Sequence, residues 1–109
     1  MATQQTDNDE QARREARATL DSLRNKYWNA KKQNPPPNFD DLFDLRSAYE
    51  DAAVEYAGLE GRLLRDDILT SDVDLVKLQK VRAAMAEAVE IKEILKVAQS
   101  FIKLMMAVV

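Results

Sequence analysis

The chain has 109 residues, with 16 basic and 19 acidic side chains and neither cysteine nor histidine. The absence of cysteine excludes disulfides and thiolate chemistry, and the absence of histidine removes the commonest general base and metal ligand. Two glycines and three prolines are too few for a turn-rich β fold. We therefore expect residues 1–109 to form a single helical domain, a size at which roughly two thirds of the unfolded surface is buried on folding.

The N-terminal third predicts a polar tail, a helix and a rigid connector. Residues 1–7 are polar. Apolar side chains then recur at alternating spacings of four and three, which predicts a helix over residues 8–32. The three successive prolines at 35–37 end this pattern, because proline lacks a backbone N–H and has a fixed φ. We expect residues 33–38 to connect the first helix to the second.

The second segment predicts a helix over residues 39–68 that contains two glycines. Each glycine should cost about 0.5–1 kcal/mol relative to alanine inside a helix. Ala53, Ala57 and Gly61 lie four residues apart and form a ridge of small side chains. The ridge predicts close approach of another helix, and a kink near Gly58 is the alternative.

The remaining residues predict one long third helix, over residues 72–108. Apolar positions recur at spacings of three and four without interruption from Val81 to Val109, as in coiled coils and helical bundles. Residues that favour helix N-caps precede the second and third helices, at Asn38 and Ser71. The sequence thus predicts an all-α protein, an elongated up-down-up three-helix bundle with antiparallel, coiled-coil-like seams.

Charge is distributed unevenly along the chain. Residues 1–34 carry a net charge of +2, residues 35–75 a net charge of −8 and residues 76–109 a net charge of +3. An acidic helix between two weakly basic ones suits a bundle in which neighbouring helices attract each other. We favour this interpretation over an acidic docking face, although single surface ion pairs contribute only about 0.2–1 kcal/mol.

The sequence offers no candidate catalytic, cofactor-binding or metal-binding residue. The serines have no histidine to activate them. The acidic residues near 66–74 lack the glycine and the terminal glutamate of a calcium-binding EF-hand loop. Basic clusters are small and the net charge is negative, which argues against nucleic acid as a partner. We expect neither an enzyme nor a binder of small-molecule substrates.

The C-terminal end is the most apolar part of the sequence. If the third helix runs back along the first two, residues 100–109 project about 12–15 Å past the proline connector, at 1.5 Å per residue. Exposed apolar patches of this kind usually mark an interface. The candidate partner-binding residues are Phe101, Ile102, Leu104, Met105, Met106, Val108 and Val109.

These patterns predict a non-enzymatic helical interaction or scaffold protein that binds a protein partner or self-associates. The alternative is a peripheral membrane protein whose C-terminal amphipathic helix lies in the interface, with Lys92, Lys96 and Lys103 facing anionic headgroups. No segment has the pattern of a secretory signal or a membrane span, so a cytoplasmic location is the default expectation.

Overall fold

The computed structural model describes residues 4–65 and 70–107, and these residues form four helices. The helices are α1 (Gln4–Lys31), α2 (Phe39–Arg65), α3 (Asp72–Glu87) and α4 (Ile91–Ala107). The described residues contain no strand, so the predicted all-α class is confirmed. The helix α1 begins four residues earlier than expected, within the predicted polar tail.

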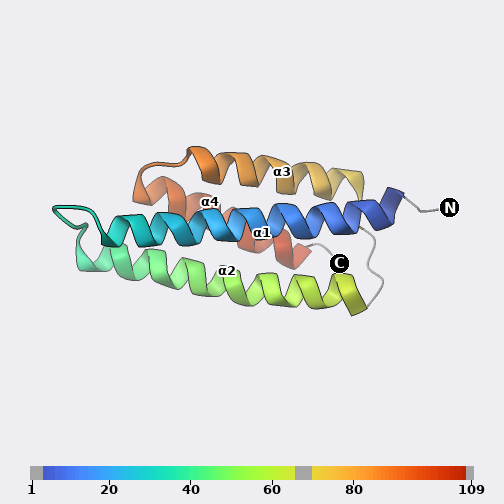
Figure 1. Cartoon of the computed structure of the whole chain (residues 1–109), viewed down its shortest axis with the longest axis horizontal. Helices are drawn as coiled ribbons and strands as arrows, with labels where there is room; N and C mark the ends of the chain where they lie inside the picture. The colour runs from blue at the N-terminus through green and yellow to red at the C-terminus, as the bar shows by residue number, and fades with distance from the viewer. Residues whose placement is uncertain (1–3, 66–69, 108–109) are drawn as a thin grey trace.

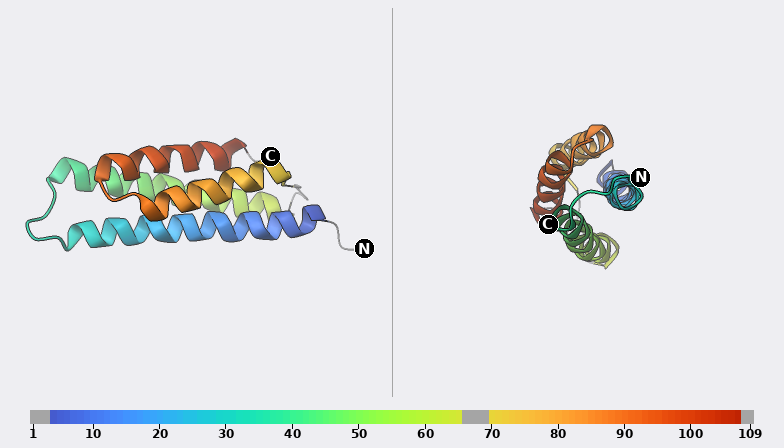
Figure 2. Two further views of the ribbon diagram at one scale, coloured as in Figure 1. Left: turned by 90° about the horizontal axis from the view of Figure 1, so that it is seen from above. Right: turned by 90° about the vertical axis from the view of Figure 1, so that its left-hand side faces the viewer.

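The four helices lie along one common axis in a molecule that measures 55 × 22 × 18 Å (Figure 1). The helices α1 and α2 form a long antiparallel hairpin, and α3 and α4 form a shorter one beside it (Figure 2). Contacts join α1 to α2 and α3, and α4 to α2 and α3, with a few between α1 and α4. Within the described residues α2 and α3 do not touch, so the helices follow one another around the core in the order α1, α2, α4, α3.

The core consists of one continuous cluster to which all four helices contribute. Every helix buries one face, as expected for amphipathic helices in a bundle. The buried residues of this core cluster are Ala12, Ala16, Leu20, Leu23, Ala30, Leu45, Ala52, Tyr56, Leu59, Leu63, Leu75, Leu78, Met85, Ala88, Ile94, Ala98, Phe101 and Met105.

Both predicted helix caps are present. The side-chain oxygen of Asn38 accepts from the N–H of Asp41 at 2.8 Å, at the start of α2. Ser71 Oγ accepts from the N–H of Asp74 at 3.1 Å, at the start of α3. Each bond satisfies one N–H that the helix itself leaves without a partner.

The predicted number of helices is wrong, because the segment 72–108 is two helices and not one. The buried face of α3 includes Leu78 and Met85, and that of α4 includes Ile94 and Phe101. Met85 and Ile94 are nine residues apart, about two and a half helical turns. In one straight helix they would point in opposite directions. The chain instead turns back at residues 88–90, which lets both faces reach the same core.

A lysine from α1 holds this turn, which contains neither glycine nor proline. Ala88 has an extended backbone, with φ −66° and ψ 128°. Lys26 donates through Nζ to the carbonyl oxygen of Ala88 at 2.5 Å and to that of Ala86 at 3.4 Å. These carbonyls lie at the negative end of α3, where a cation and a donor are both favourable.

At the other end of α3, two residues of α1 hold the segment that precedes the helix. The buried Asn8 side chain donates to the carbonyl oxygen of Thr70 at 3.2 Å and to Asp72 Oδ1 at 2.7 Å. The N–H of Thr70 donates to Asp9 Oδ1. The helix α1 therefore holds both ends of α3 through hydrogen bonds.

A substitution in the turn before α4 distinguishes two separate helices from one continuous helix, because it should change the free energy of unfolding in opposite directions in the two cases. The carbonyl of Glu90 accepts the first helical bond of α4, from the N–H of Ile94 at 2.9 Å, so Glu90 occupies the N-cap position. Aspartate caps a helix well, and Glu90→Asp should therefore raise the free energy of unfolding by about 0.5–1 kcal/mol. Inside a continuous helix the same change would lower it, because aspartate has the poorer helix propensity. Urea unfolding followed by circular dichroism separates the two outcomes.

Candidate protein-interaction surface

Four of the seven predicted partner-binding residues lie in or against the core. Phe101 and Met105 are fully buried. Ile102 and Leu104 are partly buried and pack against the core. The C-terminal end would project only if residues 72–108 formed a single helix, whereas they form α3 and α4. Because α4 turns back on α3 and then runs beside α2 in the same direction, its residues up to Ala107 lie beside the other helices (Figure 1).

The other three residues lie at the end of α4 or beyond it. Met106 is 59% exposed. Val108 and Val109 lie outside the described residues. Partner binding at this end stays a prediction.

A line of exposed apolar side chains runs along the outer side of α2, interrupted between Phe43 and Val54 by the ion pair of Arg46 and Glu50. Phe39 is 77% exposed, Val54 68% and Leu64 67%, although all three belong to a helix that packs in the bundle. At about 100° per residue they point away from the buried face that contains Leu45 and Leu59. We call this line the outer stripe. It comprises Phe39, Phe43, Val54, Ala57, Gly61 and Leu64.

No helix of the described chain covers the small residues of the outer stripe. A Cβ on Gly58 would have Arg62 Nη1 as its nearest neighbour, at 3.5 Å, and one on Gly61 would have only Arg65 Nη2, at 3.8 Å. Both neighbours are flexible side chains of α2 itself. Of the predicted ridge, Ala53 packs against the core, whereas no helix of residues 4–65 and 70–107 approaches Ala57 or Gly61 closely. The cost of the glycines is therefore not offset by a contact within the described residues.

A groove lies on the surface where α2 packs against α4, next to the outer stripe. Its volume is about 330 Å³. Ala48 of α2 and Leu95 and Ile102 of α4 form a partly buried apolar floor, while Asp44 and Asp51 lie exposed on the α2 rim. The complete lining is Asp44, Ser47, Ala48, Asp51, Leu95, Gln99 and Ile102.

Four carboxylates lie on one side of α2, and two of them, Asp44 and Asp51, line the groove. Their spacings of four, seven and four residues place them on one helix side over about 22 Å. None of the four has an ion-pair partner among the residues that the structure describes. We call them the acidic row: Asp40, Asp44, Asp51 and Glu55. Attraction between neighbouring helices therefore does not account for this part of the negative charge of α2.

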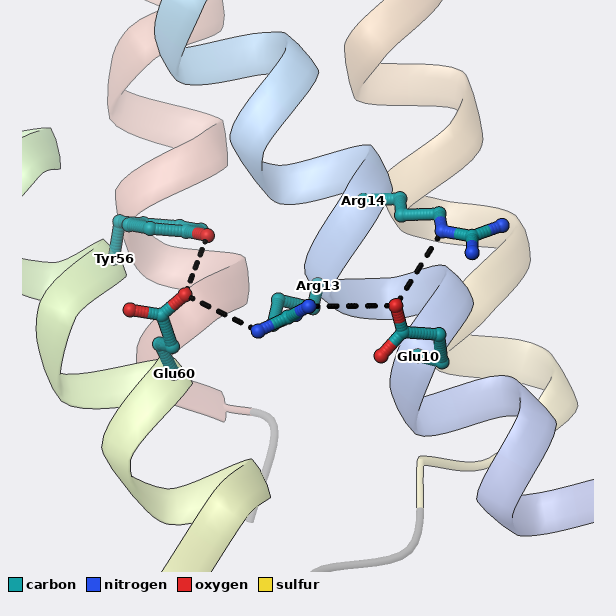
Figure 3. A network of polar contacts seen from close by, with 5 residues as sticks. All are labelled: Glu10, Arg13, Arg14, Tyr56 and Glu60. Carbon is teal, nitrogen blue, oxygen red and sulfur yellow. Dashed lines mark hydrogen bonds and ion pairs between the residues drawn. The ribbon is translucent and has the colours of Figure 1, made fainter.

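The ion pair between α1 and α2 belongs to a separate network, shown in Figure 3. Glu60 of α2 pairs with Arg13 of α1 at 3.7 Å and accepts from the Tyr56 hydroxyl at 3.0 Å. Arg13 and Arg14 both pair with Glu10, each at 3.4 Å. Each guanidinium thus faces a carboxylate, so the network links the two helices and offers no unbalanced positive charge.

Burial raises the pKa of Tyr56 above its usual value, and the hydrogen bond to Glu60 raises it further. The phenol is therefore protonated at neutral pH, where it donates to Glu60. The guanidinium of Arg17 lies over the ring of Tyr56, 5.9 Å from its centroid, and donates to Asp21 at 3.3 Å, and both neighbours raise the pKa of the arginine. The sequence does not predict this network, because its contacts between helices join residues that are distant in the chain, Arg13 with Glu60 and Arg17 with Tyr56.

No group of three or more acidic side chains within 4–65 and 70–107 is placed to hold a metal ion. In the same ranges, no helix combines the length and the apolar character that crossing a membrane requires.

Comparison with known proteins adds no further information on the site. No family model matches the chain, and no similar curated protein or solved structure is found.

Proposed function

We propose that this protein is a non-enzymatic interaction module whose outer stripe on α2 binds a helix of a protein partner. The observation that supports it is the exposure of four large apolar side chains, each more than half exposed, on one face of one helix. Single exposed apolar residues are normal on protein surfaces, whereas apolar residues that follow one another on one helix face, as from Val54 to Leu64, are typical of interaction sites.

The small residues of the outer stripe support a helix as the bound element. Ala57 and Gly61 present almost no side chain, so the backbone of a second helix can approach closely between the larger Val54 and Leu64. Close approach increases the number of dispersion contacts. Apolar anchors at spacings of three, four and seven residues are also the usual pattern of helix recognition. Such a contact would offset the cost of two glycines inside α2.

The alternative, a membrane-surface protein anchored by α4, would need the apolar face of α4 to be free. In the structure this face packs inward, with Phe101 and Met105 in the core. The helix would have to leave the bundle before it could enter a lipid interface. The exposed apolar side chains of α2 need no such rearrangement, and we therefore base the proposal on them.

Site-specific photocrosslinking in the native cells tests the proposal. A photoreactive phenylalanine analogue at position 54 or 64 of the full chain should give a defined protein adduct. The same analogue at position 80, on the exposed surface of α3, is the matched control and should give none. The change Val54→Glu should abolish the adduct formed from position 64, because it buries an unpaired charge in the contact.

Two results would contradict the proposal. One is the absence of adducts from both positions on α2. The other is an equal yield of the same adducts from position 80, because α3 does not contact α2 and its exposed surface lies elsewhere in the bundle.

A further inference from the structure

We infer that the groove between α2 and α4 receives a basic amphipathic helix from a partner protein. This inference rests on the proposed function and names the chemistry of the partner. The groove and the outer stripe are neighbours on α2, because Ser47 lies one turn after Phe43 and Asp51 lies just under one turn before Val54. A helix in the groove would therefore contact both.

The floor of the groove is suited to an apolar anchor. Ala48, Leu95 and Ile102 are partly buried hydrophobic residues that pack against the core from below and line the groove from above. The groove volume of about 330 Å³ lies at the lower end of the range for ligand pockets. An apolar side chain that enters it would lose contact with water without any displacement of the core.

The acidic row determines the charge of the partner. Its members lie on one side of α2 at spacings of four, seven and four residues. Lysine or arginine side chains at similar spacings on a partner helix can therefore face several of these carboxylates at once. No described residue of this chain pairs with them. Charge complementarity thus favours a basic helix and disfavours an acidic one.

A second copy of this chain does not supply such a helix. Its positively charged helix α4 carries Lys92, Lys96 and Lys103, but the apolar face of that helix is already buried against α2 and α3. An amphipathic helix can fill the groove only if its apolar face is free. The other described helices likewise bury their apolar faces in the core, so we infer that the occupant belongs to a different protein.

Two model peptides provide the binding test. The first is an amphipathic helix of leucine and lysine, about 18 residues long, and the second replaces every lysine with glutamate. The full chain should bind the lysine peptide at least about tenfold more tightly in fluorescence anisotropy. The affinity should fall between about 0.1 and 1 M salt, as the Debye length shortens from about 10 to 3 Å. Equal binding of both peptides, or of neither, would overturn the inference.

Three variants, each verified as folded by circular dichroism, place the binding in the groove. Asp44→Asn combined with Asp51→Asn removes two rim charges and should weaken binding of the lysine peptide about tenfold. Ser47→Trp fills the groove without changing the charge and should weaken binding to a similar extent. The control combines Glu87→Gln with Glu93→Gln, which removes the same charge elsewhere and should change the affinity less than about twofold.

The outcomes separate this inference from the proposed function. A loss of affinity in the control as large as in the rim variant would show non-specific attraction and overturn the inference. Unchanged binding by Ser47→Trp would overturn it as well. If photocrosslinks from position 54 persist unchanged in the Ser47→Trp chain, the partner occupies the outer stripe alone. The proposed function would then stand without the groove.

Discussion

Phe101→Ala should lower the free energy of unfolding by about 3–5 kcal/mol, the range for removal of a buried phenylalanine side chain. Phe101 is fully buried and belongs to the largest such side chains in the core. Domains of this size are stable by only about 5–15 kcal/mol, so the variant should have a much lower urea midpoint. Urea unfolding monitored by helical circular dichroism measures the change.

Met106→Ala is the matched control for this experiment. Met106 lies on the same helix but is 59% exposed, so its truncation should change the free energy of unfolding by no more than about 0.5 kcal/mol. Equal, small effects of the two substitutions would mean that α4 does not pack in the bundle. The C-terminal end would then project from the bundle, as the sequence suggested.

Ala52→Leu should destabilise the protein by about 1–3 kcal/mol, whereas Ala57→Leu should be nearly neutral. Both residues lie on α2, but Ala52 is fully buried and Ala57 is exposed. Three extra carbon atoms at position 52 would overpack the core. In a domain of about 100 residues, 1 kcal/mol corresponds to roughly 4–8 °C in Tm. Thermal unfolding of the two variants at low protein concentration gives the comparison.

A loss of stability in Ala57→Leu as large as in Ala52→Leu would place Ala57 against another helix of the same chain. That result would contradict the exposed position of the outer stripe. If the loss for Ala57→Leu appears only at high protein concentration, the ridge is covered by a second copy in solution.

Local sequence signals predicted those parts of the fold that depend on neighbouring residues. Three prolines in succession predicted the connector between α1 and α2, and Asn38 predicted the start of α2. Ser71 likewise predicted the start of α3. Each of these residues acts on the backbone within a few positions of itself, so one stretch of sequence contains the whole interaction.

The turn between α3 and α4 was not predicted, because no glycine or proline marks it. Its signal is instead a shift in the side of the helix on which the large apolar residues lie. The apolar spacing continues through Ala84 and Ala88, and an alanine satisfies it whether buried or exposed. Ala84 proves to be exposed. The larger side chains contain the missed signal, because Met85 and Ile94 cannot lie on one side of a straight helix.

The candidate site was harder to predict than the fold. The second helix has apolar residues on two sides, and the sequence alone does not show which side faces the core. Leu45 and Phe43 are only two residues apart, yet one is buried and the other is exposed. The choice depends on where α1 and α4 lie. The groove between α2 and α4 likewise exists only because α4 folds back.

The hydrogen bonds that α1 makes to both ends of α3 bear on the order in which the molecule folds. Lys26 and Ala88 are 62 residues apart, and Asn8 and Thr70 are separated by the same number. The hydrogen bonds that hold the second hairpin at residues 70 and 88 thus come from α1, and a fragment with only α3 and α4 lacks them. During synthesis α1 leaves the ribosome first. Its hydrogen-bonding side chains are thus already present when α3 and α4 emerge.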